Sequence, residues 1–381
     1  MLPTKWQSID DDDEKSVISA LYSDQLTAGK NVEQFENAVC LYANIKYAVA
    51  VSSGTAALHS ALFAIGIGPG DEVIVPALTF VATANAVVYL GATPVFVDIN
   101  SETLSINIQE IESKITSRTK AIIAVDYAGI PCNYKFLHEI TKKYSLPLVA
   151  DACHSLGATY QNVKVGTLAD ITVFSFHPVK SITTGEGGMA VTSNKEYADK
   201  MRRFRNHNMT FDHKQRAELC DWRYDITELG FNYRITDIQC ALGQSQLNKL
   251  TKLLEIRKII ADHYRKTLEK MDYLSCIPEI SDIESANHFF VVKLETDHLL
   301  SHKNDIFCSL RENQIPVNVH YMPVHLFSYY RSNYNTKKGM CPIAEDAYER
   351  LLTLPITPNM KTDDMHYITE KFEHILNKFS S

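Results

Sequence analysis

Two side chains that can do chemistry, Lys180 and Asp151, each follow an apolar run. Lys180 comes after ITVFSFHPV and Asp151 after LPLVA, twenty-nine positions earlier (180 − 151). Each run predicts a buried strand, so Lys180 stands in a turn between strands, partly removed from water. Desolvation lowers the pKa of a lysine and frees its amine to attack a carbonyl carbon. A solvated lysine on a surface turn is the simpler alternative.

A third feature is suited to an anion. The run YAVAVSSGTAALHSAL predicts a strand, a turn at Ser53, Gly54 and Thr55, and then a helix. The first backbone N–H groups of a helix, here those of Gly54, Thr55 and Ala56, point out of its N-terminus and favour phosphate.

These three features together fit pyridoxal 5′-phosphate (PLP). Its aldehyde needs an amine such as that of Lys180, its phosphate needs a helix N-terminus, and its pyridine nitrogen needs an acid. An ordinary aspartate is ionised at neutral pH, so Asp151 can keep that nitrogen protonated. The sequence therefore predicts a PLP site assembled from three distant segments.

Alternating strands and helices must position these groups. The expected strands are Tyr47–Val51, Glu72–Pro76, Thr93–Val97, Ala121–Val125, Leu146–Ala150, a run from Ile171 to Phe176, and Gly188–Val191; the expected helices are Thr55–Ile65, Phe80–Leu90, Ile108–Ile115 and Lys135–Tyr144. Continuous apolar strands joined by helices predict an α/β fold with a mainly parallel central sheet. Parallel strands bring their carboxyl ends to one edge, where α/β folds place chemistry.

The pattern changes in the last third of the chain. GFNYRITDIQCALG opens a long helical region that reaches about Met271. A smaller α+β unit is expected beyond it, with strands Phe289–Leu294 and Val317–Tyr321 and helices Asp305–Arg311, Ile343–Leu352 and Asp363–Phe379. We therefore expect a large cofactor-binding domain over residues 1–255 and a small C-terminal domain over 256–381.

Composition excludes several classes of function. The net charge is −7 with no basic block, which argues against nucleic acid as a partner. The eight cysteines form no C-x-x-C pair and show no metal-ligand spacing, so we predict reduced thiols and no metal site. The N-terminus does not resemble an export signal, and charged residues and prolines interrupt the most apolar region. We expect a cytoplasmic protein without a membrane span.

Several strings resemble one family. LTAGK, SSGTAALHSAL, PALTFVATANAV, VADACHSLGA, FSFHPVKSITTGEGG, GFNYRITDIQCALG and VHYMPVH occur in the order found in the DegT/DnrJ/EryC1/StrS sugar aminotransferases, from Leu26 to His325. The resemblance implies a fold-type I PLP-dependent transferase. It makes Lys180 the catalytic lysine that also holds PLP.

The resemblance assigns further cofactor contacts. It implies that Ser175 binds the phosphate with Ser53, Gly54 and Thr55, and that His154 hydrogen-bonds the cofactor beside Asp151. Phe80 would stack on the pyridine face, although core packing is the commoner fate of a phenylalanine. Asn232 would reach the phosphate of a second subunit, which implies a homodimer with shared active sites.

Substrate contacts are also implied by resemblance. The turn Asp24, Gln25, Leu26 and Thr27 would lie at the mouth of the site, and His320 and Tyr321 would face the substrate. Asp126 or Tyr127 could lie near the site, and His177 could merely position the lysine turn. We interpret Arg202, Arg203 and Arg205 as a solvated helix face, and expect Asn208 to take a left-handed backbone where the family has glycine.

The implied reaction transfers the amino group of L-glutamate to C4 of a UDP-linked 4-keto-6-deoxy-N-acetylhexosamine, as in pseudaminic acid synthesis. Another UDP- or dTDP-keto-deoxy sugar is the main alternative. A sugar dehydratase of the same family would carry His in place of Lys180. A regulatory protein would not need Lys180, Asp151 and Ser175 together, and SSGTAA lacks the G-x-G-x-x-G of a Rossmann oxidoreductase.

Overall fold

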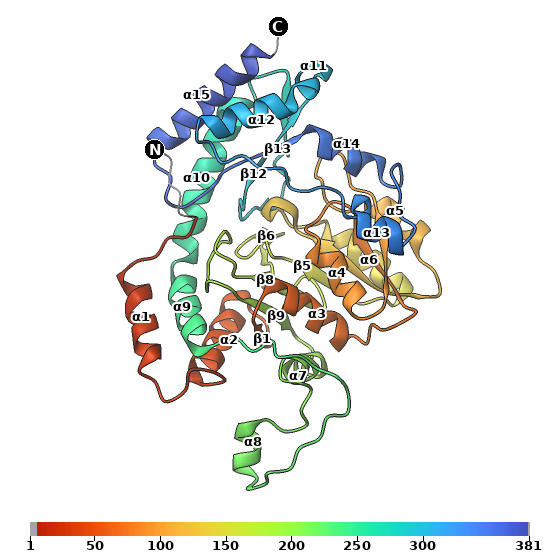
Figure 1. Ribbon diagram of the computed structural model, residues 1–381, viewed down its shortest axis with the longest axis vertical. Coiled ribbons are helices and arrows are strands. Elements are labelled where there is room, and N and C mark those ends of the chain that lie inside the picture. Colours follow the sequence, from red (N-terminus) through yellow and green to blue (C-terminus); the bar gives the residue numbers. More distant parts are fainter. Residues whose placement is uncertain (1–5, 380–381) are drawn as a thin grey trace.

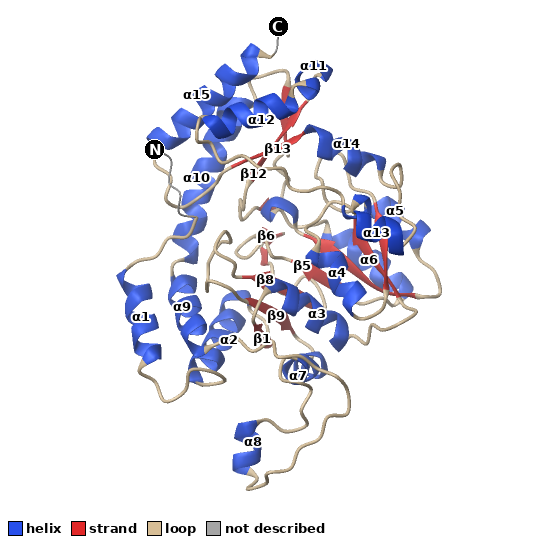
Figure 2. Ribbon diagram, in the orientation of Figure 1, coloured by secondary structure: helices blue, strands red, loops and turns tan. Residues whose placement is uncertain are grey.

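The computed structural model in Figure 1 describes residues 6–379. Residues 1–5 and 380–381, the outer ends of the two expected domains, lie outside the described residues. Figure 2 shows a large sheet with helices around it and a smaller helical and stranded unit above it. Helix α10 runs from the large unit into the small one (Figure 1), and residue 255 lies within this helix.

The large sheet has seven strands in the order β1-β9-β8-β5-β4-β2-β3. Their bounds are β1 Tyr47–Val51, β2 Glu72–Pro76, β3 Thr93–Val97, β4 Thr119–Val125, β5 Leu148–Asp151, β8 Ile171–Ser175 and β9 Gly188–Thr192. Strands β3, β2, β4, β5 and β8 pair in parallel, whereas β9 is antiparallel to both β8 and β1. The prediction of a mainly parallel sheet is confirmed.

Helices cover both faces of this sheet. The helices of this part of the chain are α1 Asp11–Leu21, α2 Lys30–Ala43, α3 Gly54–Ala64, α4 Ala82–Tyr89, α5 Ile108–Lys114, α6 Tyr134–Tyr144, α7 Lys195–Phe204, α8 His213–Glu218, α9 Asp237–Asn248 and α10 Leu250–Leu268, with a 3-10 turn η1 at Tyr127–Gly129. Because side chains alternate along a strand, Val73 and Val75 of β2 join one core with α3, α4 and α7, while Ile74 joins a second core with α2, α5, α6 and α9.

A second, three-stranded sheet has the order β10-β12-β13. Its strands are β10 Leu274–Cys276, β12 Phe290–Leu294 and β13 Leu351–Leu354; the remaining helices are α11 Asp297–Ser301, α12 Lys303–Glu312, α13 Ser328–Asn333, α14 Pro342–Arg350 and α15 Thr362–Lys378, with η2 at Val324–Leu326. A third small sheet orders β11 Ile283–Glu284, β6 Thr159–Tyr160 and β7 Val163–Lys164.

Two predictions for this region are wrong. Leu351 and Leu352 were expected in a helix but belong to β13, because a short buried apolar run fits either element and pairing with β12 decides it. The expected strand Val317–Tyr321 is reduced to a single bridge between Asn318 and Thr353. Beyond that bridge the carbonyl oxygen of His320 accepts a hydrogen bond from the Tyr127 hydroxyl instead of a strand N–H.

The prediction of a solvated arginine face on α7 is also wrong for Arg205. Its Nη1 donates to Glu36 Oε1 at 2.6 Å and to the Ala50 carbonyl at 2.7 Å, because the end of α7 packs against β1. Asn208 has the expected left-handed backbone, with φ of 58°.

Over residues 6–379, helices long and apolar enough to cross a membrane are absent. The same residues contain no group of three or more His, Cys, Asp or Glu side chains placed to hold a metal ion.

Candidate active site

The lysine turn connects two paired strands of the large sheet. Lys180 lies between β8 and β9, and its backbone N–H donates to the His177 carbonyl at 2.9 Å. The ring of the exposed His177 accepts a long 3.5 Å bond from Val179 N, which suits a turn-positioning role. Burial lowers the pKa of Lys180; Cys153 and Asp151 oppose this shift and the charge of Arg257 adds to it. Lys180 is only partly exposed, so the alternative of a freely solvated lysine does not hold.

Asp151 ends β5, the strand next to β8. It is only 6% exposed, and its Oδ2 accepts a 2.7 Å hydrogen bond from Thr83 Oγ1. Its Oδ1 accepts from the Cys153 N–H at 3.3 Å. Strand β5 pairs in parallel with β8, so Asp151 and the lysine turn lie at the same edge of the sheet, and the charge of Asp151 raises the pKa of Lys180.

A cradle for an anion lies at the N-terminus of α3. Ser53 caps this helix, its side chain accepting from the Ala56 N–H at 3.1 Å, so the first turn is fixed. A Cβ atom on Gly54 would lie 3.0 Å from Ser175 Cβ and 3.1 Å from Cys153 Sγ. Only glycine therefore lets Ser175 approach the helix N-terminus this closely. The early amides of a helix lack intrahelical acceptors, so this corner can bind phosphate.

The glycine-rich run after the lysine turn, residues 185–188, forms a tight backbone corner. Gly185 has φ of +78°, and a Cβ on Gly188 would lie 2.3 Å from the Ser53 carbonyl oxygen. Glycine at 188 thus lets β9 lie directly against the segment that carries the anion cradle.

Phe80 lies in the segment between β2 and α4, two residues before the helix begins, and is 54% exposed. Its ring centroid is 5.8 Å from that of Tyr321. Core packing, the alternative for Phe80, is excluded by this exposure, and the ring face remains available to a ligand.

His154, Tyr321 and His320 form one wall of the site with two residues that the sequence reasoning missed, His288 and Phe289. His154 Nε2 lies 3.2 Å from the Tyr321 hydroxyl, and its ring stacks on His288 at 4.5 Å. His320 stacks on Phe289 at 4.6 Å. Burial, then the charge of Lys180, holds the pKa of His154 well below its usual range and lowers that of His320 to about 4. Both rings are therefore neutral at pH 7.

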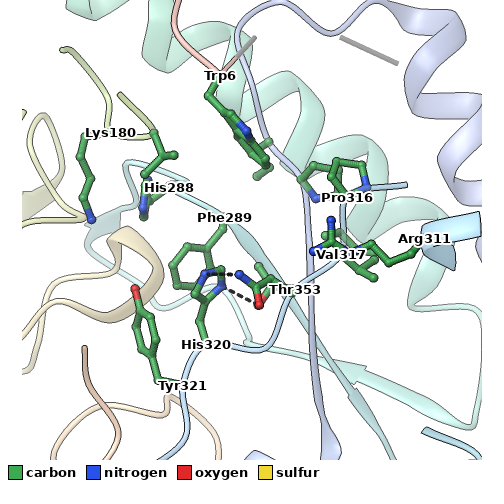
Figure 3. Close-up of a pocket in the computed structure, with 15 residues that line it drawn as sticks. Trp6, Lys180, His288, Phe289, Arg311, Pro316, Val317, His320, Tyr321 and Thr353 are labelled. Carbon is green, nitrogen blue, oxygen red and sulfur yellow. Dashed lines mark hydrogen bonds between the residues drawn. The ribbon is translucent and has the colours of Figure 1, made fainter. Parts of the chain in front are cut away.

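A cavity of about 240 Å³ extends from Lys180 between this wall and the small sheet. In Figure 3 the side chains of Lys180, His288 and Tyr321 point into the same space, and Trp6 and Arg311 lie farther from Lys180. The buried Nδ1 atoms of His154 and His288 have no hydrogen-bond partner among the described residues. Such orphaned atoms are expected where a ligand completes the site.

Asp126 and Tyr127, which directly follow β4, differ in whether they contact the site. The Tyr127 hydroxyl donates to the His320 carbonyl and so supports the wall. Asp126 is buried one layer behind, where its carboxylate accepts from Ser155 Oγ at 2.6 Å, Tyr134 OH at 2.9 Å and Cys132 N at 2.9 Å. Only Tyr127 contacts the site directly.

The turn Asp24, Gln25, Leu26 and Thr27 is exposed and is anchored to the start of α9. The Leu26 carbonyl accepts from the Asp237 N–H at 3.0 Å, and Thr27 bridges Thr236. These four described residues do not line the cavity. They lie near the glycine-rich corner, because Gln239 of α9 donates to the Glu186 carbonyl at 2.6 Å.

Asn232 is exposed on the arm between α7 and α9, residues 205–236, and also does not line the cavity. Its neighbours Phe231 and Tyr233 stack on each other at 5.0 Å and pack against the buried His59. The Tyr233 carbonyl accepts from the Ser52 N–H at 2.9 Å, so the base of the arm lies beside the anion cradle.

The sequence also carries two signals that were not used, at His288 and at Arg257, whose charge lowers the pKa of Lys180. His288 is a titratable side chain directly before the apolar run of β12, at the opposite end of its strand from Asp151 and Ser53, so the rule that found those two residues could not find it. Arg257 is a lone cation on the apolar stripe of α10, spaced with Leu253, Ile260 and Tyr264. Such a position is normally apolar, so an arginine there needs an explanation.

The lysine turn between β8 and β9, on a mostly parallel sheet, is the arrangement of fold-type I PLP-dependent transferases. The sequence pattern of the DegT/DnrJ/EryC1/StrS aminotransferase family matches residues 7–373. The chain belongs to this family of sugar aminotransferases.

Individual relatives cover nearly the whole chain. UDP-4-amino-4,6-dideoxy-N-acetyl-beta-L-altrosamine transaminase of Campylobacter jejuni is 38% identical over 381 residues, covering 99% of this chain and 98% of the relative. PseC of Helicobacter pylori, an aminotransferase of pseudaminic acid biosynthesis, superposes with a TM-score of 0.92 at 33% identity over 99% of this chain and 100% of the other. The PLP form of the putative sugar aminotransferase Spr1654 from Streptococcus pneumoniae gives 0.93 at 31% identity, covering 100% of both.

Proposed function

We propose that this aminotransferase uses PLP to move the amino group of L-glutamate to C4 of a UDP-linked 4-keto-6-deoxy-N-acetylhexosamine. The observation that carries the proposal is the convergence of Lys180 and Asp151 beside the corner formed by Gly54 and Ser175. The substrate is supported by the Campylobacter jejuni transaminase and by PseC, which are similar over the whole chain.

The residues present fit PLP. The corner of Ser53, Gly54, Thr55 and Ser175 would hold the phosphate, because a helix N-terminus and a hydroxyl converge there. When bound, PLP supplies a conjugated ring that accepts the electron pair left on a substrate carbon by proton loss.

Three side chains would orient the ring. Asp151 would face the pyridine nitrogen, with its carboxylate held by Thr83. Phe80 would cover one face of the ring with its exposed side chain. His154 would use a ring nitrogen for which the described residues supply no partner.

Lys180 would move the proton at the reacting carbon. Its lowered pKa raises the fraction of neutral amine, which is the form that accepts a proton. The same neutral amine is the nucleophile that attaches to the cofactor aldehyde. His320 and Tyr321 line the cavity that opens from this amine, so we place the substrate against them. We place Asp24, Gln25, Leu26 and Thr27 at the mouth.

We propose a homodimer in which the arm completes a second copy's site. The arm exposes apolar side chains, including Trp222 at 83% and Leu229 at 85%. Such exposure is unfavourable in a monomer and typical of an interface. In Figure 1 helix α8 stands away from the body of the molecule. Asn232 of this arm would contact the cofactor phosphate of the partner.

We also propose the two-domain division at residues 255 and 256 and a cytoplasmic location. The division is supported by a separate apolar core whose members run from Ile260 to Leu376, although α13 and α14 pack on the large-domain core. The eight free cysteines support a reducing compartment.

The test is turnover of a panel of UDP- and dTDP-linked keto sugars with glutamate, followed by product analysis. We expect amination at C4 of the UDP-linked N-acetylated 4-keto sugar by the wild-type enzyme. Lys180→Ala should lose at least a thousandfold in rate. Lys46→Ala, which removes an exposed lysine, is the control. Full turnover by Lys180→Ala would contradict the catalytic role assigned to Lys180. A preference for a dTDP-linked sugar would contradict the proposed UDP-linked substrate.

A further inference from the structure

Arg257 of α10 is a buried cation, and its hydrogen-bond partners among the described residues are backbone carbonyls. The residue is 1% exposed, and over residues 6–379 it forms no ion pair with a carboxylate. Its Nη1 donates to the His288 carbonyl at 3.0 Å and to the Ile356 carbonyl at 3.2 Å. Its Nη2 donates to the Lys180 carbonyl at 3.3 Å, and its Nε has no hydrogen-bond partner within the part of the chain that the structure describes.

Burying an unpaired charge is costly, and hydrogen bonds to carbonyl dipoles offset only part of that cost. Burial lowers the pKa of Arg257 to about 10, so the group is still charged at neutral pH. The neighbouring stripe residues Leu253, Ile260 and Tyr264 show that an apolar side chain would suit this position. Fold stability alone therefore does not account for an arginine here.

The three acceptors share one property. Lys180, His288 and Ile356 all line the 240 Å³ cavity, Lys180 from the large sheet and the other two from the segments flanking the small sheet. A single planar guanidinium can donate in several fixed directions, which no lysine can reproduce. Arg257 thus joins both walls of the cavity through the backbone.

We propose that Arg257 is a positioning residue that acts through Lys180, fixing the lysine turn against the opposite wall and placing a permanent positive charge behind its amine. The effect on turnover rests on the proposed function, whereas the effect on the Lys180 amine does not. Arg257 itself does not line the cavity.

The charged and titratable groups around Lys180 set the direction of the effect. Burial is the main cause that lowers the pKa of Lys180, and the charge of Arg257 lowers it further. Cys153 and Asp151 raise it. His154, His288 and His320 also face Lys180 and stay neutral, since its charge helps to lower the pKa of each. Removing the charge at position 257 should therefore raise the pKa of Lys180.

The first experiment needs neither cofactor nor substrate. Trace acetylation of each lysine as a function of pH, read by mass spectrometry, gives the titration midpoint of Lys180 in the cofactor-free protein. In Arg257→Met the midpoint should rise by about one pH unit. In Arg257→Lys, which keeps the charge, it should stay within about 0.3 unit of wild type. Arg265→Met, on the same helix and bonded to the Ile277 carbonyl, is the matched control and should leave it unchanged.

The second experiment separates positioning from charge. With glutamate and keto sugar, Arg257→Lys should lower kcat about tenfold and leave KM within a factor of three of wild type. The reason is that lysine keeps the positive charge but lacks the planar guanidinium that donates to several carbonyls at once. Arg257→Met should lower kcat about a hundredfold.

An unchanged Lys180 midpoint in folded Arg257→Met overturns the proposal. If that variant does not fold, Arg257→Lys decides the matter, since kcat equal to that of Arg265→Met would assign Arg257 a merely structural role. Should the wild-type protein aminate no sugar, the proposed function fails, and the acetylation midpoint alone still tests the link between Arg257 and Lys180.

Discussion

The Oδ2 atom of Asp151 accepts a 2.7 Å hydrogen bond from the Thr83 hydroxyl, which itself lies 2.8 Å from the hydroxyl of Thr79. Both threonines are almost fully buried. Since the Cys153 N–H occupies Oδ1, the carboxylate is held from both sides before any ligand binds. The acid that would face the pyridine nitrogen is therefore already oriented.

Thr83→Val removes one of these bonds with little change in volume. We expect PLP to bind about tenfold more weakly, since a hydrogen bond to a charged group is worth roughly 1.5 kcal/mol. Thr79→Val is the matched control, because Thr79 contacts Thr83 but not the carboxylate, and it should cost less than a factor of two. Fluorescence titration of the cofactor-free variants measures both. Wild-type affinity in Thr83→Val would show that this bond does not orient Asp151.

Phe80→Leu tests the stacking surface. Replacing the ring removes aromatic contact worth roughly 1 kcal/mol, so PLP affinity should fall about fivefold while the melting temperature hardly changes. Phe136→Leu, which alters a phenylalanine of similar exposure on α6, is the control. Unchanged affinity in Phe80→Leu would rule out the assigned contact.

Asp126 should make stability depend on pH. Burial is the main cause that raises its pKa from 3.8 to about 6. Because the unfolded chain ionises this carboxyl first, stability is greatest below about pH 4 and falls as pH rises through 6, by roughly 3 kcal/mol for this group.

Asp126→Asn should remove that dependence. Urea unfolding at pH 5 and pH 8 should show that the variant gains stability over wild type as pH rises. Asp272→Asn, an exposed site, should leave the wild-type slope intact. If the free energy of unfolding changes with pH equally in wild type and in Asp126→Asn, the pH dependence does not come from Asp126.

The arm offers a test of assembly. Leu229→Asp places a charge on an apolar side chain that is 85% exposed in the single chain, so dilution should shift the protein from dimer to monomer and weaken PLP retention. Ile259→Asp, 60% exposed on α10, serves as the comparison. Sedimentation velocity reads the outcome, and an unaltered dimer in Leu229→Asp argues against an interface through the arm.

The strands of the large sheet could be predicted from the sequence because each is marked by residues within and next to it. Tyr47–Val51, Glu72–Pro76 and Thr93–Val97 are bounded by turn residues and are continuous apolar runs, so their bounds match the structure. Lys180, Asp151 and Gly54 were found because each follows such a strand. The parallel order then brings them to one edge.

What the sequence could not supply depends on tertiary contact. Leu351 and Leu352 become a strand only because β12 offers a partner, and Arg205 is withdrawn from solvent only because Glu36 lies opposite. The stack of His154 on His288 joins positions that no local pattern connects. The sequence shows Arg257 as a charged residue on an otherwise apolar stripe of the helix. It does not show which three carbonyl groups accept its hydrogen bonds.

The most direct test of the central claim is borohydride reduction of the purified protein followed by peptide mapping. We expect a yellow protein that bleaches on reduction and carries a pyridoxyl-phosphate group on Lys180, with no such group in Lys180→Ala. A colourless protein that binds no PLP, or a label on a different lysine, would contradict it.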